Sequence, residues 1–378
     1  MKRKLTYYTN MPTPYQLDFI EALAVHFDLK VVFFTARESD RQWDLRKNFN
    51  SEIHYTTLRN SGLVRWIQRK IVSFHFSILI FPLLFKDPAD FIIINGTYWS
   101  PNVVLALLIS KFRKKKVFYY GEPVFKSSSK LQSWIKKNIL AFPLKNFTDA
   151  TFAIGKLAII SYRELGYRKN LYNIPYNKNT ELFKNSNIDI SKKTQLIDAY
   201  KRSGEAIILT SGSLIERKGM DTLIKAFLLL PGYTNAKLII MGDGPELASL
   251  KTLSKKDPRV LFVGFQDKLW IPVYFAIADI FAFASRYDGW GLVINEAVAS
   301  GTAIICSDKV GAAVDLLENR RNAIILDSED VEGFSHAMKE LIENEIKRSE
   351  IVKNSKDLEP KLSSAYNAKL VYDICGTT

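Results

Sequence analysis

Short apolar runs alternate along this chain with longer stretches in which apolar residues recur at helical spacing. Unbroken apolar runs are typical of strands buried on both faces, and helices between such strands indicate a parallel sheet covered on both sides. Helical stretches in the first half include residues 15–26 and 102–111. The strands predicted for the first half are residues 5–9, 29–35, 53–58, 91–95, 116–120 and 150–154.

The same alternation repeats in the second half, after a polar stretch at residues 175–193 that we predict to be a linker. A chain of 378 residues is too long for one ordinary core. We therefore predict an α/β protein with two Rossmann-like, doubly wound domains at residues 1–180 and 181–355, and a C-terminal helix at 356–378 that packs back on the first domain. The strands predicted for the second half are residues 206–210, 237–241, 260–263, 280–284, 303–306 and 323–326.

The composition, 47% apolar and 24% charged, is that of an ordinary globular protein. The two cysteines, Cys306 and Cys375, are far apart, and together with four histidines they show no metal-binding spacing. We therefore expect a reducing compartment, no bound metal and no cofactor. The N-terminal residues begin a strand at once, without an apolar signal segment, so we expect a cytoplasmic protein.

The formal net charge of +14 is concentrated in the first half. Residues 1–180 carry 28 Lys and Arg against 12 Asp and Glu, whereas residues 181–378 carry 25 against 27. Such an excess suits an anionic partner, which could be nucleic acid, a lipid surface or a substrate. The chain shows no nucleic-acid-binding motif, so we expect no nucleic acid among its partners.

One apolar run of the first half, residues 71–85, follows a basic segment at residues 65–70. It is interrupted by Pro82 and is too short to cross a bilayer, which takes about 20 apolar residues. We predict that most of it is a buried helix, with an interfacial segment as the alternative. Basic clusters at residues 113–116 and 126–137, the latter containing Trp134, favour an anionic membrane surface as a partner.

A glycine-rich loop follows the predicted strand 280–284 and opens into a helix. It carries Asp288, Gly289 and Gly291, and Glu296 comes after Asp288 with seven residues between them. Glycines let the backbone approach a ligand, a helix N-terminus favours an anion, and a carboxylate can accept hydrogen bonds from sugar hydroxyls. The loop suggests a site for a phosphorylated sugar or nucleotide, although an ordinary strand-to-helix turn can have the same glycines.

A second loop with candidate chemistry follows the predicted strand 206–210. Gly212 permits a tight turn, and Arg217 and Lys218 precede an amphipathic helix. Arg can bind phosphate through two hydrogen bonds and Lys acts as a point charge, although such a pair is often a solvated surface feature. A third glycine loop, residues 241–246, is either a plain structural turn or a ligand contact.

Taken in their order along the chain, these three loops resemble those of the retaining family-4 glycosyltransferases. Members of that family have two Rossmann-like domains facing across a cleft (the glycosyltransferase B-type fold). The resemblance covers about residues 200–330 and reaches the first half only in layout. It implies that Arg217 and Lys218 bind the donor diphosphate, Asp288 the transferred sugar and Glu296 the ribose. The donor-binding residues that it implies are Gly212, Arg217, Lys218, Gln266, Asp288, Gly289, Trp290, Gly291, Leu292 and Glu296.

The chain departs from the family pattern in both halves. Asp288 stands where the family has a Glu, and Ser213 where many members have an Arg. Many members also have a glycine pair in the first loop of the first half, where this chain has residues 10–16. That loop is explained either by acceptor or donor contacts or by Thr13 capping the helix that follows.

Candidates for the acceptor side come from loops after the strands of the first half. Glu122, which follows strand 116–120, is the candidate for the catalytic residue of the first half. The alternative is that Glu122 is an ordinary loop acid. As the catalytic residue, Glu122 would act with Arg217, Lys218 and Asp288 of the second half. The other acceptor-side candidates are Pro14, Tyr15, Gln16, Tyr98 and Trp99.

The resemblance implies a metal-independent, retaining hexosyltransferase that moves a sugar from a nucleotide-sugar donor to a glycan or lipid-linked acceptor. We expect a role in cell-surface polysaccharide or lipopolysaccharide biosynthesis, at the inner face of the cell membrane. Two alternatives stay open. One is another enzyme on the same scaffold, such as a sugar-nucleotide 2-epimerase or a glycan phosphorylase, and the other is a non-catalytic binder of anionic lipid.

Overall fold

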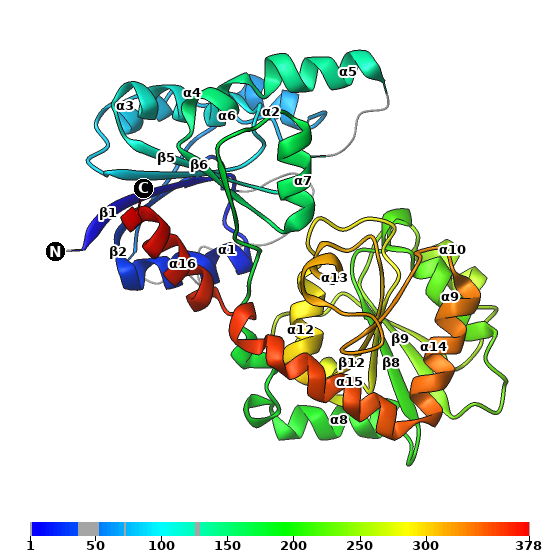
Figure 1. The fold of residues 1–378 in the computed structure, drawn as a ribbon. Coiled ribbons are helices and arrows are strands. Elements are labelled where there is room, and N and C mark those ends of the chain that lie inside the picture. Colours follow the sequence, from blue (N-terminus) through cyan, green and yellow to red (C-terminus); the bar gives the residue numbers. More distant parts are fainter. Residues whose placement is uncertain (1, 37–52, 72, 125–128, 378) are drawn as a thin grey trace. The chain divides into compact units, whose positions relative to one another are not determined.

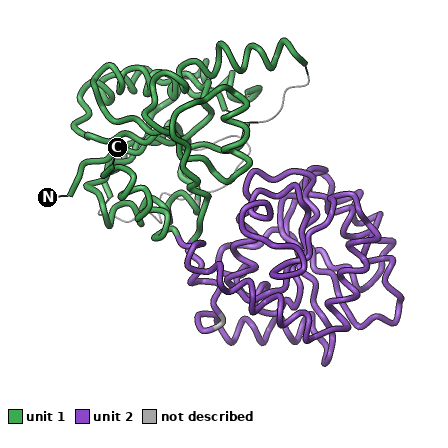
Figure 2. Tube along the Cα trace, in the orientation of Figure 1, with its two compact units in different colours: residues 1–178, 364–378 green, residues 179–363 purple. Residues whose placement is uncertain are grey.

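The structure is a computed structural model that describes residues 2–36, 53–71, 73–124 and 129–377. The chain divides into two compact units, shown in different colours in Figure 2. Unit 1 comprises Met1–Lys178 and Ser364–Thr378, and unit 2 comprises Asn179–Ser363. The chain returns from unit 2 to unit 1 after residue 363 rather than after residue 355, because the 3₁₀ helix η6 (Lys356–Leu362) buries Leu362 within unit 2.

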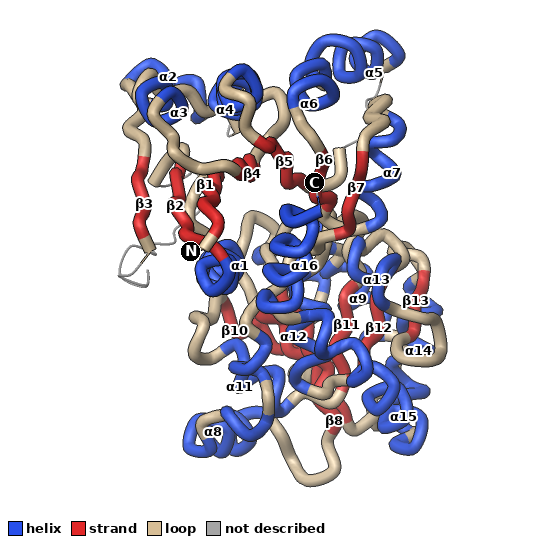
Figure 3. The backbone as a smooth tube through the Cα atoms, turned by 60° about the vertical axis from the view of Figure 1, so that its left-hand side comes forward, coloured by secondary structure: helices blue, strands red, loops and turns tan. Residues whose placement is uncertain are grey.

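Unit 1 is built on a parallel sheet whose described residues form seven strands in the order β3-β2-β1-β4-β5-β6-β7 (Figure 3). All six strands predicted for this half are present. The apolar pattern does not predict β7, because this edge strand has Asn at both ends and no fully buried residue. The strands are β1 (Arg3–Thr9), β2 (Phe27–Phe33), β3 (His54–Thr57), β4 (Phe91–Asn95), β5 (Lys116–Gly121), β6 (Ala150–Ala153) and β7 (Asn170–Asn173).

Helices cover both faces of this sheet (Figures 1 and 3). On one face α1 (Pro14–His26) packs against the C-terminal helix α16 (Ser364–Thr377), where the ring of Tyr372 lies 5.4 Å from those of His26 and Phe27. The helices that bury apolar side chains against the other face are α3 (Ile80–Phe85), α4 (Pro101–Phe112), α6 (Phe142–Phe147) and α7 (Lys156–Glu164). On the same side lie α2 (Gly62–Gln68), the short α5 (Lys130–Ile135) and the π-helical turn η2 (Lys136–Leu140).

The prediction that residues 71–85 form mostly a buried helix is wrong. Of the described residues in this run, only those of α3 are helical, and Ile71, Ile78 and Leu79 are exposed. Side chains of α4 and its N-cap bind the backbone before α3: Ser100 Oγ accepts from the amide of His75, and Asn102 Oδ1 from that of Ser77. These hydrogen bonds hold the segment in an irregular conformation, so its apolar side chains cannot all face the core.

Unit 2 contains a second parallel sheet, whose described residues form six strands in the order β10-β9-β8-β11-β12-β13. All six were predicted from the apolar runs, and the two doubly wound α/β sheets confirm the predicted fold class. The strands are β8 (Ala206–Ser211), β9 (Ala236–Met241), β10 (Val260–Gly264), β11 (Ile280–Phe283), β12 (Ala303–Ser307) and β13 (Ile324–Leu326). The α-helices are α8 (Ile190–Tyr200), α9 (Met220–Leu228), α10 (Leu247–Leu253), α11 (Ile271–Ile277), α12 (Leu292–Ser300), α13 (Gly311–Leu316), α14 (Val331–Glu343) and α15 (Glu345–Ser355).

The core of unit 2 forms where α9 and α14 pack on the sheet. Phe227 of α9 and Phe334 of α14 are fully buried there. Among the described residues of both units, every helix is too short or too polar to pass through a bilayer.

Candidate active site

The candidate residues of unit 2 come together because β8 and β11 are neighbours in the sheet. Parallel strands end at one edge, so the loops that follow these two strands meet there. Two contacts join the loops: the amide of Arg286 donates to the carbonyl of Arg217 at 2.8 Å, and the Ser285 hydroxyl donates to the same carbonyl at 3.1 Å. The loop with the basic pair is thereby held against the loop with the acid.

The basic pair contacts the predicted sugar-binding acid directly. Lys218 Nζ donates to Asp288 Oδ2, and Arg217 Nη1 lies 3.9 Å from the same oxygen. Lys218 also lies over the ring of Phe283, 5.1 Å from its centre. The Lys218 and Asp288 side chains are 14% and 16% exposed, whereas that of Arg217 is 43% exposed. Two cations and one carboxylate therefore share a partly shielded site at the edge of the sheet.

The acid-bearing loop is anchored to the loop that follows β12. The amide of Asp288 donates to the carbonyl of Lys309 at 3.1 Å, and the amide of Gly311 donates to the carbonyl of Asp288 at 3.0 Å. A Cβ on Gly311 would lie 2.2 Å from the carbonyl oxygen of Gly289, so the approach requires glycine. Asp288 Oδ1 also accepts a hydrogen bond from the amide of Trp290 at 3.3 Å.

Helix α12 starts at the end of this loop. Gly291, with φ of +86°, turns the chain into the helix, and a Cβ there would lie 2.5 Å from Val310 Cγ1. The first amides of the helix, including that of Leu292, have no side-chain cap, which leaves them directed toward the loop. Glu296 lies on the second turn and is buried.

The loop after β10, which carries Gln266, and the loop after β9 differ in character. Gln266 follows β10 and donates from Nε2 to the carbonyl of Val263 at 2.7 Å, which fixes its side chain beside the strand end. In the loop 241–246, a Cβ on Gly242 would lie 1.9 Å from the carbonyl oxygen of Gly212. Gly242 is therefore needed for close packing against the loop that follows β8, which favours the structural explanation of the turn at 241–246.

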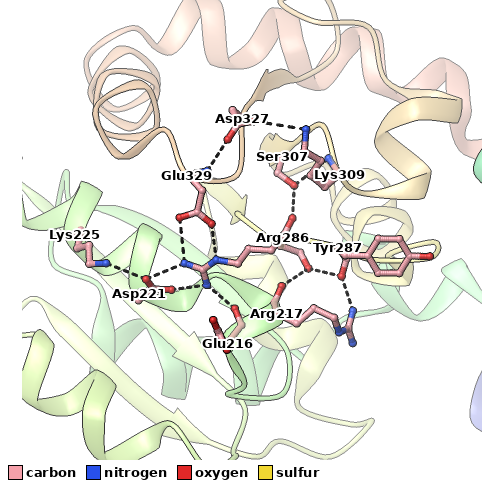
Figure 4. A network of polar contacts seen from close by, with 11 residues as sticks. Glu216, Arg217, Asp221, Lys225, Arg286, Tyr287, Ser307, Lys309, Asp327 and Glu329 are labelled. Carbon is pink, nitrogen blue, oxygen red and sulfur yellow. Dashed lines mark hydrogen bonds and ion pairs between the residues drawn. The ribbon is translucent and has the colours of Figure 1, made fainter. Parts of the chain in front are cut away.

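Sequence reasoning did not single out Arg286, which occupies the centre of an ionic network (Figure 4). Its guanidinium donates to both carboxylate oxygens of Asp221 at 2.9 and 3.0 Å, to Glu329, and to the carbonyl of Glu216. Lys225 adds a second cation at 3.0 Å from Asp221. The network connects the start of α9, the basic loop and the loop after β13, so Arg286 positions Arg217 and Lys218.

The same network shifts the acid–base equilibria of its members. Burial by itself would raise the pKa of Asp221, but hydrogen bonds and ion pairs with Arg286 and Lys225 lower this pKa to about 2. Hydrogen bonds with Asp221 and Glu329 raise the pKa of Arg286. The only sequence signal for this role was the place of Arg286 in the same loop as Asp288.

In unit 1, the predicted candidate Gln16 forms a hydrogen bond to a strand of the sheet. Its Nε2 donates to Asn95 Oδ1 at 2.8 Å, and the Thr9 hydroxyl donates to the same oxygen at 2.9 Å. Asn95 in turn donates to the carbonyl of Tyr120 at 2.9 Å. These buried bonds join the ends of β1, β4 and β5. Thr13 caps α1 by accepting from the amide of Gln16, as the alternative explanation of this loop predicted.

The remaining unit 1 candidates lie around the same edge of the sheet. Pro14 begins α1. Tyr15 packs on Tyr176, with ring centres 4.8 Å apart. Tyr98 is buried, which raises the pKa of its phenol to about 12, so it is a core residue rather than an open stacking platform.

Trp99 and Glu122 remain accessible at this edge. Trp99 is partly exposed, and Glu122 is exposed just after β5. The carbonyl of Glu122 accepts a hydrogen bond from the buried Tyr162 hydroxyl at 2.8 Å, which anchors the backbone beneath its side chain. Among the described residues, no cluster of three or more His, Cys, Asp and Glu could hold a metal ion.

Comparison with known proteins defines the class of this fold. The structure of Anabaena HepE in complex with UDP superimposes with a TM-score of 0.80, at 17% identity, over 99% of this chain and 100% of that one. The same protein in complex with UDP-glucose gives a TM-score of 0.77 over 99% and 100%. The chain therefore has the glycosyltransferase B-type fold, as the sequence resemblance predicted.

Sequence comparison gives matches in the second half of the chain. Residues 192–358 match the family described as glycosyl transferases group 1. A lipopolysaccharide core biosynthesis glycosyltransferase of Rhizobium meliloti is 32% identical over 139 residues, which is 36% of this chain and 39% of that protein. A GDP-mannose-dependent phosphatidylinositol monomannoside mannosyltransferase of Mycobacterium tuberculosis is 27% identical over 165 residues, 41% of this chain and 43% of that protein. The matches thus span less than half the length of these curated relatives.

Proposed function

We propose that this protein is a retaining glycosyltransferase that moves a hexose from a nucleotide-sugar donor to a glycan or lipid-linked acceptor. The observation that carries the proposal is the cluster of Arg217, Lys218 and Asp288 at the edge of the unit 2 sheet, beside the start of α12. The site joins groups for a diphosphate to groups for sugar hydroxyls. The match of unit 2 to the group 1 glycosyl transferases supports it.

In this proposal the donor diphosphate lies between the basic pair and the first amides of α12. Arg217, which is exposed, can form two hydrogen bonds to phosphate, and Gly291 and Leu292 present backbone N–H groups. Glu296 accepts hydrogen bonds from the ribose, and Gln266 lies beside the base. The negative charge that develops on the leaving diphosphate is then stabilised by groups that are already oriented, which is electrostatic catalysis.

The ion pair between Lys218 and Asp288 implies an order of events when the donor binds. A diphosphate carries more negative charge than one carboxylate, so it displaces Asp288 as the partner of Lys218. Asp288 is then free to accept hydrogen bonds from the transferred sugar. Lys218 thus serves the leaving group and Asp288 the sugar, and each is held ready by the other beforehand.

The acceptor is assigned to unit 1, with Glu122 and Trp99 as the accessible candidates at the end of its sheet. Glu122 would contact the reacting groups, and Trp99 would stack on a sugar. The names of the relatives, which include a lipopolysaccharide core enzyme and a mannosyltransferase acting on a phosphatidylinositol mannoside, support a glycan or lipid-linked acceptor. Cell-surface polysaccharide or lipopolysaccharide biosynthesis is the process proposed.

The test is release of a nucleoside diphosphate from a panel of nucleotide sugars, with and without candidate acceptors. We expect acceptor-dependent release from one donor class, a product that retains the donor's anomeric configuration by NMR, and activity that survives EDTA. Inversion at the anomeric carbon would contradict the proposal. Isomerisation of a nucleotide sugar without an acceptor would instead identify an epimerase, and phosphate-dependent cleavage of a glycan would identify a phosphorylase.

A further inference from the structure

The helical layer on one face of the unit 1 sheet exposes many large apolar side chains. Soluble surfaces carry single exposed apolar residues without consequence, but a set spread across one layer marks an interaction surface. Helices α2 to α6 form this layer (Figures 1 and 3). Its most exposed apolar residues, each 54–82% exposed, include Leu63, Trp66, Phe112, Leu131, Trp134 and Ile139.

The segment formed by α5 and η2 gives the strongest sign that this layer meets a partner. None of its residues is buried, although Leu131, Trp134 and Ile139 are large and apolar. Helical segments this short are marginal in water unless they pack an apolar face against something. Within unit 1, α5 projects away from the sheet (Figure 1) and continues into η2, which contacts α6. Among the described residues of unit 1, its apolar face therefore has no partner that buries it.

The charge of the same layer specifies the partner. The described residues between 59 and 147 include 14 Lys and Arg against three Asp and Glu. Lys114, Lys130 and Lys137 are exposed, and Lys70 Nζ lies 5.0 Å from the centre of the Trp66 ring. Lysines placed beside exposed Trp and Leu side chains match the boundary of an anionic bilayer, where phosphates meet acyl chains. A nucleic acid would use the lysines but would leave Leu131 and Ile139 in water.

We propose that helices α2 to α6 form a membrane-binding face, with α5 and η2 lying in the headgroup region of an anionic bilayer. Leu131, Trp134 and Ile139 insert at the acyl boundary, and the lysines bind lipid phosphates. The two signals act together, because neither basic residues alone nor a few apolar side chains alone give stable attachment. This inference goes beyond the proposed reaction, and it places the membrane on unit 1 rather than on the donor-binding unit.

The apolar part is tested by sedimentation of the whole protein with vesicles of phosphatidylglycerol and phosphatidylcholine. The variant L131S/W134S/I139S should bind at least tenfold more weakly, since inserted side chains would be lost. The matched control L229S/Y233S/I346S removes three large exposed side chains from unit 2, which are 57–88% exposed, and should bind like the wild type. Equal binding by these two variants would overturn the proposed location of the membrane face.

The role of the lysines is tested with a second pair of matched variants. This pair keeps the proposal testable even if the first variant does not fold. K114Q/K130Q/K137Q should lower the affinity by roughly a hundredfold, about fivefold for each lysine near the surface. K251Q/K255Q/K256Q removes the same charge from exposed positions of unit 2 and should change it little. Raising the salt concentration should weaken wild-type binding, because exposed charges are screened over about 8 Å at physiological ionic strength.

The depth to which the tryptophans insert into the bilayer can be measured by fluorescence quenching with brominated lipids. The double variant W66F/W134F should lose most of the quenching seen in the wild type, while still sedimenting with anionic vesicles. Failure of the wild type to sediment with anionic vesicles at low salt would overturn the proposal, as would tighter binding to a nucleic-acid duplex than to vesicles. None of these assays contains a nucleotide sugar, so their outcome is independent of the proposed reaction.

Discussion

At the scale of single residues, the most informative contact is the ion pair between Lys218 and Asp288. It joins two side chains to which the family resemblance gives different tasks, the diphosphate and the sugar. Both are partly shielded from water, so the pair interacts more strongly than one at the open surface. In the proposed function, this contact makes donor binding a competition between two anions for one lysine.

Replacing Asp288 by Asn should therefore separate binding from turnover. Nucleoside diphosphate should bind up to about tenfold more tightly to D288N, because Lys218 no longer has a competing carboxylate, while sugar transfer should fall by orders of magnitude. Calorimetry and product release measure the two effects. The control D308N removes an exposed carboxylate that is likewise paired with a lysine, Lys309, in the neighbouring loop, and it should change neither. Weaker diphosphate binding by D288N would contradict the competition.

Glu296 should behave in the opposite way. The substitution E296Q keeps the size of this buried side chain but removes its charge, so binding of the nucleoside diphosphate should weaken by about 1.5–3 kcal/mol. Because Glu296 is assigned to the ribose, the loss should appear with the diphosphate alone, without any sugar. Calorimetry on the folded variant checks this, and unchanged affinity would remove Glu296 from the site.

At the scale of elements, the site depends on the connection between three loops. Arg286 joins Asp221 at the start of α9 to Glu329 after β13, and it binds the carbonyl of Glu216 in the basic loop. The order of strands in the sheet brings these loops to one edge, and the network then fixes their spacing. Loss of the network should loosen the basic loop without removing any group that the proposal assigns to the donor.

The network predicts a specific sensitivity to acid. The pKa of Asp221 is lowered to about 2 in the folded protein, from 3.8, because its ion pairs with Arg286 and Lys225 outweigh the effect of burial. A lowered folded-state pKa stabilises the fold above pH 3.8, and this stabilisation is lost as the pH falls from about 4 toward 2. After allowance for partial exposure, the contribution is roughly 1–2 kcal/mol.

Urea unfolding of unit 2, followed at pH 5 and at pH 3, measures this contribution. The variant D221N should be less stable than the wild type at pH 5, and the difference should shrink at pH 3. The control D198N replaces an exposed carboxylate on α8 and should show no such convergence. A difference between D221N and the wild type that stays constant with pH would show that the network does not act through the charge of Asp221.

At the scale of the whole molecule, the chain forms two units with separate cores, and the residues that we propose for donor binding all lie in unit 2. Of the two units, unit 1 carries the basic, apolar helical layer and the candidate acceptor residues. The proposed division of labour is thus one unit for the nucleotide sugar and one for the acceptor and the membrane.

This division predicts how ligands affect thermal unfolding. In differential scanning calorimetry the nucleoside diphosphate of the correct donor should raise the transition of unit 2 and leave that of unit 1 in place. At a ligand concentration a hundred times the dissociation constant, the added stability is about 2.7 kcal/mol. Anionic vesicles should affect unit 1 instead. A diphosphate that raised only the transition of unit 1 would contradict the assignment of the donor site.

The sequence by itself determined the elements and the candidate chemistry. Apolar runs predict strands because a strand in a parallel sheet is buried on both faces, which is why β7, a polar edge strand, escaped prediction. Glycine positions and the pair Arg217 and Lys218 could be read locally, since a loop carries its own chemistry. The resemblance to a glycosyltransferase family followed from these local features.

The tertiary structure decided which of these features meet. Lys218 and Asp288 are 70 residues apart, and they pair only because β8 and β11 are neighbours in the sheet. Gln16 is bound to Asn95 for the same kind of reason. Ile71, Ile78 and Leu79 are exposed because α4 holds the backbone of their segment in an irregular conformation. Periodicity along the chain records whether a residue is suited to burial, but strand order and long-range hydrogen bonds determine which partner it finds.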